Sequence, residues 1–427
     1  MILIYSEINT ARLQFACDFI FSEQLQTPFR ITTSGKEFID YAGAKINYSN
    51  HRIENSYFIR AHQLLFEQGI RHQDTACFVK NEQPFFFPCS DADFHFDIFA
   101  ASFYLLSRYE EYLPHESDMY GRYAHENSLA FKEGFLNKPL INDWLILFSG
   151  SLMSAFPGIV LPARSFTFLP TYDIDIAYSF KHKGPVRNLG GFIKSPSMER
   201  LMVLAGLRKD PFDSYAFMDS LHAENRLSPV YFFLVATSGS LYDKNISPYS
   251  HAMWQLIKRH SYKYRLGLHP SWRSYGSLPV LKKEKKIMET AGGKEINISR
   301  QHYIKLSLPK TYQMLIEAGI EKDYSMGYGS INGFRASVAS SFLWYDLHKE
   351  KTTGLRLYPF CFMDANSFYE QRQDTTQSLA ELKYYMDACK KVNGLFITIF
   401  HNNFLGSDEQ FAGWKELYTS FISQVQG

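Results

Sequence analysis

The chain has 427 residues, with 45 Lys and Arg against 43 Asp and Glu, so its formal net charge is +2. A charge this close to zero provides no basic field for a polyanion, and we expect no nucleic-acid partner. The length allows two or three domains with a large buried core.

Three features bear on the compartment of the protein. No apolar stretch approaches the roughly 20 residues needed to cross a bilayer, so we expect no membrane-spanning segment. The five Cys residues are scattered without a C-x-x-C pair, which is typical of reduced thiols in the cytosol. The first seven residues resemble a strand rather than a signal peptide. We therefore expect a cytoplasmic protein; the oligomeric state stays open.

The first part of the chain mixes strand and helix patterns. Residues 2–5 predict a short strand, and residues 11–22, 98–113 and 144–153 predict helices from their apolar spacing. The turn signal Pro157-Gly158 follows the last of these helices. We therefore place a domain boundary near residue 160, with an α/β accessory domain over 1–160 that packs on a second domain over 161–427.

The second part alternates strands and helices. The expected strands are residues 166–171, 230–235, 265–268, 355–360 and 395–400. The expected helices between them are residues 215–224, 251–259, 310–318 and 377–391. This alternation predicts parallel strands covered by helices, a fold class in which the chemistry lies at the carboxyl ends of the strands.

Polar residues follow several of these strands. Side chains alternate along an extended chain, so Asp173 and Asp175 should point to the same side. Two carboxylates so placed suit a metal ligand beside a general base. The alternative is that one Asp caps the next element and the other pairs with an Arg. The remaining polar candidates, at strand ends or in a Gly-Phe-Arg-Ala-Ser segment, are His269, Asp364, His401 and Arg335.

In this order the motifs resemble those of the polysaccharide deacetylases of carbohydrate esterase family 4. The resemblance covers roughly residues 165–403, and the front part is similar to the accessory domain of a group of bacterial deacetylase-like proteins. It implies a distorted, incomplete (β/α) barrel. It also implies that Asp173 is the catalytic base, that Asp175 and His269 bind a divalent metal such as zinc, and that Arg335, Asp364 and His401 complete the site.

One position departs from the family pattern. The second motif usually carries two metal-binding His residues four positions apart, but Arg273 occupies the second position here. Catalytic zinc commonly needs three protein ligands and an open water position. We select His302, at the start of an expected helical segment, as the replacement ligand; the alternative is a His that bonds backbone or solvent at a helix end.

The expected reaction is removal of an acetyl group, on nitrogen or oxygen, from a sugar. Asp173 would take a proton from the attacking water, Arg335 would hold Asp173 ionised, and His401, kept cationic by Asp364, would protonate the leaving group. Candidates for contact with the sugar, which would otherwise be core or surface residues, are Trp272, Arg273, Tyr303 and Trp344.

Two other functions remain open at this stage. A non-catalytic carbohydrate-binding protein on the same fold would explain Arg273 as a sign of lost activity. A glycoside hydrolase would need two carboxyl groups about 5–9.5 Å apart across a cleft, which Asp173 and Asp175 on one strand fit poorly.

Overall fold

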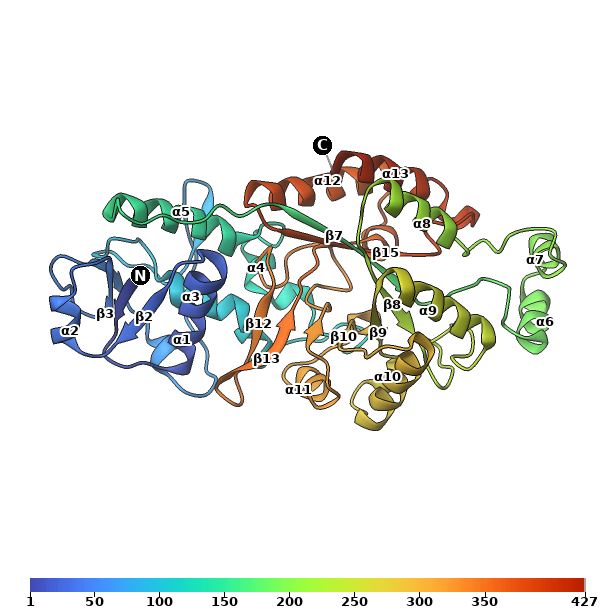
Figure 1. Ribbon diagram of the computed structural model, residues 1–427, viewed down its shortest axis with the longest axis horizontal. Coiled ribbons are helices and arrows are strands. Elements are labelled where there is room, and N and C mark those ends of the chain that lie inside the picture. Colours follow the sequence, from blue (N-terminus) through green and yellow to red (C-terminus); the bar gives the residue numbers. More distant parts are fainter. Residues whose placement is uncertain (426–427) are drawn as a thin grey trace.

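The computed structural model describes residues 1–425 as two α/β parts that lie side by side (Figure 1). We call residues 1–160 the first part and the remainder the second part. Each part contains a parallel β-sheet, and the buried apolar side chains form one core cluster that continues through both.

The first part is built on a four-stranded parallel sheet in the order β2-β1-β3-β4. Its strands are β1 (Ile2–Tyr5), β2 (Phe29–Thr32), β3 (Lys45–Ser49) and β4 (Tyr57–Arg60). Its helices are α1 (Ala11–Cys17), α2 (Gly35–Asp40), α3 (Ile98–Leu106), α4 (Leu129–Lys132) and α5 (Leu140–Ala155). A short antiparallel hairpin, β5 (Phe78–Lys80) and β6 (Gln83–Phe85), completes it.

The second part is built on a nine-stranded sheet in the order β12-β13-β11-β10-β9-β8-β7-β15-β14. Every neighbouring pair is parallel except β12 with β13. The long strands are β7 (Thr167–Ile174), β8 (Val230–Leu234), β9 (Arg265–His269), β12 (Phe342–Asp346), β13 (Lys351–Leu357) and β15 (Leu395–His401). Three strands have two residues each: β10 (Ile298–Ser299), β11 (Lys322–Asp323) and β14 (Phe362–Met363).

From β7 to β13 the parallel strands follow one another in chain order, and β15 returns to pair with the other edge of β7. Within residues 1–425, β14 pairs with neither β12 nor β13, so the sheet stays open on that side. This arrangement brings the carboxyl ends of β7, β9, β10, β14 and β15 to one end of the sheet, where a site is expected in such folds.

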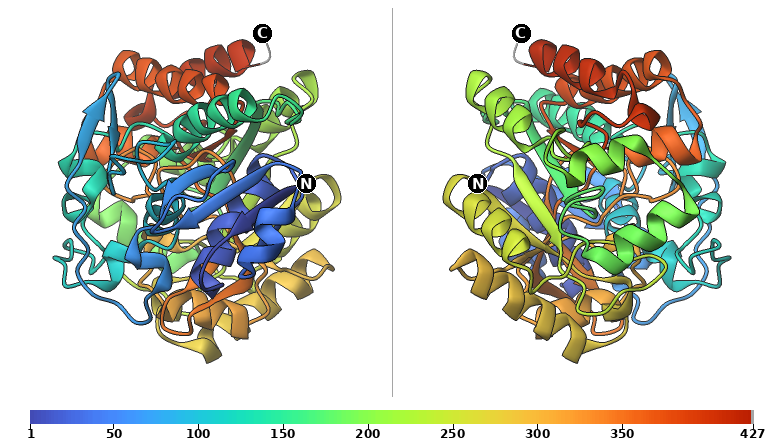
Figure 2. Two further views of the ribbon diagram at one scale, coloured as in Figure 1. Left: turned by 90° about the vertical axis from the view of Figure 1, so that its left-hand side faces the viewer. Right: turned by 90° about the vertical axis from the view of Figure 1, so that its right-hand side faces the viewer.

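Helices surround this sheet (Figures 1 and 2). They are α8 (Tyr215–Glu224), α9 (His251–Lys263), α10 (Leu278–Gly292), α11 (Lys310–Glu317), α12 (Thr375–Lys391) and α13 (Trp414–Val425), whereas α6 (Pro185–Lys194) and α7 (Met198–Leu204) lie beyond the end of the sheet (Figure 1). No helix within residues 1–425 combines the length and the apolar composition that a bilayer crossing requires.

Three of the expected element boundaries were wrong. The helix expected over residues 98–113 ends at Leu106, because Arg108 adopts a left-handed conformation with φ 54° and a 3-10 turn follows. His302 opens a 3-10 turn of three residues, not a long helix. Asp364 follows β14 rather than the strand expected at 355–360, which ends at Leu357.

Polar contacts join the two parts. Arg335 of the second part donates two hydrogen bonds to Glu111 of the first, at 2.8 and 2.6 Å, and the side chain of Asn142 accepts one from the backbone of Ala339 at 2.8 Å. Arg12 pairs with Glu350. Removing the first part would therefore expose buried ions as well as apolar surface.

We predict that residues 161–427 alone do not fold to a soluble product. Without the first part, Arg335 loses its carboxylate partner, and an unpaired buried charge costs several kcal/mol. The measurement is the soluble fraction and circular dichroism of the fragment beside the full chain. A soluble, cooperatively folded fragment would contradict the prediction and would show that the second part is independent.

Candidate active site

Three potential metal ligands gather at the carboxyl end of the nine-stranded sheet. Asp175 follows β7, His269 ends β9, and His302 lies three residues after β10. Their ligand atoms all lie within 4.8 Å of one another. Within residues 1–425 this is the one group of three or more His, Cys, Asp or Glu residues so placed.

Hydrogen bonds orient both imidazoles. Nδ1 of His269 lies 2.5 Å from the carbonyl oxygen of Arg300, and Nδ1 of His302 lies 3.0 Å from a carboxylate oxygen of Asp243. Because both partners only accept, each Nδ1 carries the hydrogen and each Nε2 presents its lone pair. Buried Asp243 is itself fixed by the backbone N–H of Trp272 at 2.9 Å. Such outer hydrogen bonds are typical of metal-binding histidines.

The donor set fits a metal ion. Nε2 of His269 lies 3.0 Å from Oδ1 of Asp175, and Nε2 of His302 lies 3.4 Å from Oδ2. Oδ1 of Asp175 is buried and has no well-aligned hydrogen-bond donor within residues 1–425. Three electron-pair donors that face each other require a proton or a cation between them, and two nitrogens with one carboxylate suit a first-row divalent ion.

The charges of these three side chains agree with this need. Burial alone would raise the pKa of Asp175, but the two imidazoles outweigh it and hold that pKa well below its usual range. Burial alone would lower the pKa of His302, but Asp175 and Asp243 raise it to about 9. The two carboxylates therefore favour positive charge at this position, which a bound metal ion would supply.

Asp173 lies beside this group and is paired with an arginine that sequence analysis missed. Its Oδ1 accepts a hydrogen bond of 2.7 Å from Arg300, and its Oδ2 lies 3.7 Å from Nε2 of His269. Arg300 is fully buried and also donates to the carbonyl oxygen of Tyr324 at 3.0 Å. Arg300 follows the two-residue strand β10, which is too short to produce a strand pattern in the sequence.

The expected pairing of Arg335 with Asp173 was wrong. Arg335 lies in the long loop between β11 and β12, and its guanidinium group binds Glu111 and the carbonyl oxygen of Gly327 instead. The competing partner comes from the first part, 224 residues away in sequence. Arg335 therefore joins the two parts and does not orient the carboxylate of Asp173.

His401 and Asp364 form a tight pair at the same end of the sheet. Nδ1 of His401 lies 2.6 Å from Asp364, whose carboxylate also accepts the backbone N–H groups of His401 and Ala365. Burial alone would lower the pKa of His401, but Asp364 and Asp175 together raise it well above its usual value. Nε2 of His401 lies 3.5 Å from Oδ2 of Asp175, and His401 is in register with Asp173 across β15 and β7.

These residues open into a pocket of about 450 Å³. Its walls include the rings of Tyr120, Tyr242, Tyr303, Tyr369 and Phe404. Tyr120 and Arg122 come from the first part, and Arg122 donates to the carbonyl oxygen of Tyr303 at 2.7 Å. Nothing in the sequence around residue 120 indicated this, because the contact depends on how the two parts pack.

Of the four residues expected to contact a sugar, three do not line the pocket. Trp272 stacks on Tyr242, with ring centroids 3.9 Å apart, and is not among the residues that line the pocket. Arg273 is exposed and donates to the hydroxyl of Ser238 at 3.1 Å. Trp344 is 1% exposed and packs against Tyr312 in the core. Tyr303 alone of these candidates lines the pocket.

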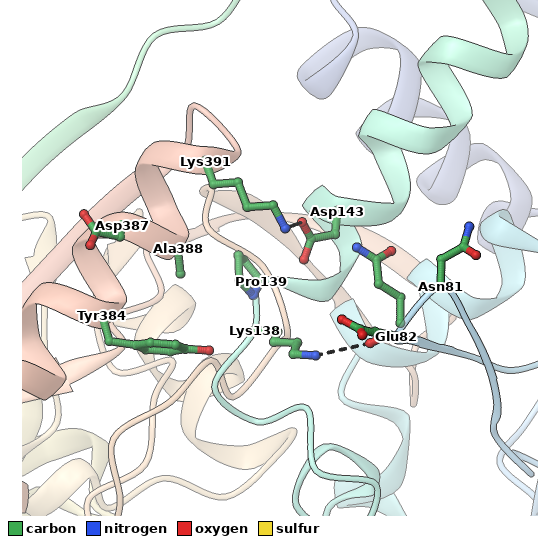
Figure 3. Close-up of a pocket in the computed structure, with 10 residues that line it drawn as sticks. Asn81, Glu82, Lys138, Pro139, Asp143, Tyr384, Asp387, Ala388 and Lys391 are labelled. Atoms are coloured by element: carbon green, nitrogen blue, oxygen red, sulfur yellow. Dashed lines mark hydrogen bonds and ion pairs between the residues drawn. The ribbon is translucent and has the colours of Figure 1, made fainter.

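A second hollow of similar size lies between the first part and α12 (Figure 3). It measures about 560 Å³, and two of its charged side chains, Lys391 and Asp143, pair with each other at 3.1 Å. It contains none of the ligand group described above. The chemistry of the side chains, rather than the volume, therefore identifies the candidate active site.

Comparisons with known proteins give a family model for the first part of the chain and similar solved structures that cover 61–62% of it. Residues 2–157 match a family model described as a family of unknown function (DUF7033), and no curated protein matches the sequence. The fold is similar to a putative polysaccharide deacetylase from Mycobacterium smegmatis, with 12% identity over 62% of this chain and 86% of that one and a TM-score of 0.41.

Two further solved structures are similar. PuuE allantoinase shares 10% identity over 61% of this chain and 84% of its own, with a TM-score of 0.40. A family 4 carbohydrate esterase from Streptomyces lividans, solved with acetate, shares 9% identity over 61% and 90%, with a TM-score of 0.31. At these identities and scores the similarity concerns the fold alone.

We predict that His302→Ala lowers metal affinity by at least about 100-fold, since loss of an inner ligand should exceed the 10–100-fold typical of outer-shell changes. Elemental analysis and competition with a chelator give the measurement. His251→Ala, an exposed His at the start of α9, is the matched control and should bind metal like the wild type. Unchanged stoichiometry in His302→Ala would remove this residue from the ligand set.

Proposed function

We propose that the protein is a metal-dependent hydrolase that removes an acetyl group from an acetylated sugar or polysaccharide precursor. One observation carries this proposal: the group Asp175, His269 and His302 is flanked by a buried carboxylate, Asp173, and by His401, which is paired with Asp364. A general base, a metal site and a general acid then adjoin one pocket.

In this proposal Asp175, His269 and His302 hold a divalent ion, with zinc the best match to two nitrogen ligands and one oxygen ligand. When bound, the ion polarises the acetyl carbonyl and lowers the pKa of its water. Asp175 supplies negative charge that matches the ion. His269 and His302 bind through Nε2 because their Nδ1 hydrogens are already donated.

Asp173 takes the proton of the attacking water. Arg300 holds its Oδ1 at 2.7 Å, which leaves Oδ2 as the free oxygen of the base, 3.7 Å from His269. The same ion pair fixes the direction in which the carboxylate points. Arg300 thus takes the positioning role that the sequence assigned to Arg335.

His401 donates a proton to the departing amine or alcohol. Its raised pKa keeps it cationic near neutral pH, and Asp364 fixes the ring through Nδ1 so that Nε2 faces the pocket. Since Asp364 is fully buried and bonds two backbone N–H groups, it positions the acid without contact with the substrate.

The aromatic wall supports a sugar as the substrate. Rings such as Tyr303 and Tyr120 can stack on the apolar faces of a pyranose, and their hydroxyl groups can bond its oxygens. The strand order and the site residues support our proposal that residues 161–427 belong to the polysaccharide deacetylase superfamily. The proposed substrate is a cytoplasmic precursor, a compartment for which the scattered Cys residues are the support.

The binding-protein alternative rested on Arg273 as the replacement of a ligand. Arg273 points to Ser238, and His302 supplies a third donor instead, so the alternative lacks a supporting contact. The glycoside hydrolase alternative needs two carboxyl groups across a cleft. Asp173 and Asp175 both adjoin His269, which disfavours it.

The experiment is acetate release from a panel of N-acetylated and O-acetylated sugars by protein loaded with zinc. We expect activity with the metal-replete wild type, its loss in chelator, and its recovery on adding the ion back. No acetate release from any acetylated sugar by metal-loaded protein would favour a carbohydrate-binding role.

A further inference from the structure

A long segment of the chain leaves the sheet directly after β7, beside the candidate active site. Asp175 directly follows β7, and four residues later the backbone N–H groups of Ser179, Phe180 and Lys181 donate to the carboxylate of Asp210, at 2.7, 2.8 and 2.9 Å. Asp210 is buried. The chain between them, which we call the α6–α7 segment (residues 180–209), therefore begins and ends at one fixed point.

Polar contacts hold the α6–α7 segment together. Arg200 on α7 donates to the carbonyl oxygen of Asn188 on α6 at 3.2 Å, and its guanidinium group lies 5.0 Å from the centre of the Phe180 ring. Arg187 on α6 donates to the carbonyl oxygens of Lys244 and Asn245, at 2.8 and 2.9 Å. Because Lys244 lines the candidate active site, the helices are tied to its rim.

The apolar side chains of these helices face outward. All ten residues of α6 are described and none of them is buried, while on α7 Val203 is the single buried residue. Val186, Leu189 and Ile193 share one face of α6 and are 83%, 62% and 73% exposed. Other large apolar side chains exposed in the segment are Met198, Leu201, Leu204 and Leu207. Figure 1 shows both helices at the right-hand end of the molecule, beyond the sheet.

The α6–α7 segment also carries a net positive charge. It contains seven Lys and Arg residues and one Glu, so the rest of the chain has 38 basic and 42 acidic residues. Arg187 and Arg200 make the internal contacts above. The other five basic residues are Lys181, Lys183, Lys194, Arg208 and Lys209. Exposed aliphatic residues beside cations match the surface of an anionic bilayer, where acyl chains lie below negatively charged headgroups.

We propose that the α6–α7 segment docks on the surface of an anionic phospholipid bilayer, with Val186, Leu189 and Ile193 inserted among the lipids. The helices then lie in the interface and do not cross it, since α6 and α7 have ten and seven residues. Arg187 connects this surface to the loop of Lys244, so docking places the candidate active site next to the membrane. The proposal does not depend on the reaction that the site performs.

The test is flotation of the full chain with vesicles of phosphatidylcholine alone and of phosphatidylcholine mixed with phosphatidylglycerol. We expect binding to the mixed vesicles, weakened at high salt. The variant Val186→Ser, Leu189→Ser, Ile193→Ser should lose at least about tenfold in binding, because insertion depends on buried apolar area. The substituted side chains are exposed, so thermal unfolding should be unchanged.

A matched control removes three apolar side chains of similar exposure elsewhere: Ile39→Ser, Val79→Ser, Val160→Ser, which are 62%, 72% and 86% exposed in the wild type. This control should bind like the wild type. Equal binding by both triple variants, or no binding of the wild type to anionic vesicles, would overturn the proposal. So would a wild-type dimer in solution that the α6 variant converts to a monomer, since the apolar face would then be covered by a second copy.

Discussion

Asp173→Asn should lower acetate release by about 10²–10⁴-fold, the usual contribution of a general base, while the metal remains bound. The metal stays because Asp175, rather than Asp173, belongs to the ligand group. The amide keeps the shape of the carboxylate and loses its capacity to take a proton. Acetate release and metal content, measured on the same preparation, separate the two roles.

The substitution also leaves a buried cation without its partner. Arg300 is fully buried and loses a 2.7 Å ion pair, which can cost about 3–5 kcal/mol when one member is removed. Activity must therefore be compared at a temperature where the variant is folded, as judged by circular dichroism. Asp219→Asn, which breaks a partly exposed pair with Lys263 away from the pocket, should retain full activity. Equal activity in the wild type and Asp173→Asn would remove Asp173 as the base.

Glu111→Gln should destabilise the folded protein by about 3–5 kcal/mol, because it leaves Arg335 and Arg108 as buried cations with less compensation. Glu111 accepts hydrogen bonds of 2.8 and 2.6 Å from Arg335 and one of 2.7 Å from Arg108, and all three residues are buried. Denaturant unfolding gives the measurement. Glu37→Gln, at the exposed pair with Arg30, is the matched control and should change stability little.

The lowered pKa of Glu111 also predicts how the stability of the folded protein depends on pH. Burial alone would raise the pKa of Glu111, but Arg335 and Arg108 lower it from 4.5 to about 2. A carboxyl group with a lowered pKa in the folded state stabilises the protein above pH 4.5, and this stabilisation is lost as pH falls from there toward 2. The difference in stability between wild type and Glu111→Gln should therefore shrink in that range. A difference that stays constant down to pH 2 would contradict the assigned ion pair.

Strand periodicity was enough to predict part of the candidate site. Asp173, Asp175, His269 and His401 each lie at the end of a strand of at least five residues, where alternation and apolar content produce a clear pattern. Parallel strands then bring their carboxyl ends together, so proximity follows without knowledge of individual contacts. In the folded protein these four residues lie around one centre.

The remaining contacts could not be found in this way. Arg300 follows a two-residue strand, and hydrogen bonding to neighbouring strands rather than local propensity defines such a strand. The partner of Arg335 lies in the first part, and no spacing rule connects residues 111 and 335. Arg273 and Trp272 lie in a 3-10 turn, whose tight geometry directs the guanidinium group to Ser238 instead of the pocket.

The segment of the first part that reaches the pocket has a consequence for how substrate choice can change. Tyr120 and Arg122 stand at the pocket while the proposed base, acid and ligands all belong to the second part. One portion of the pocket wall is thus encoded in a different stretch of the gene from the proposed reacting groups. Exchange of residues 1–160 between relatives would replace that portion of the pocket wall and leave the proposed reacting groups intact, so new specificities could arise by recombination without repeated invention of those groups.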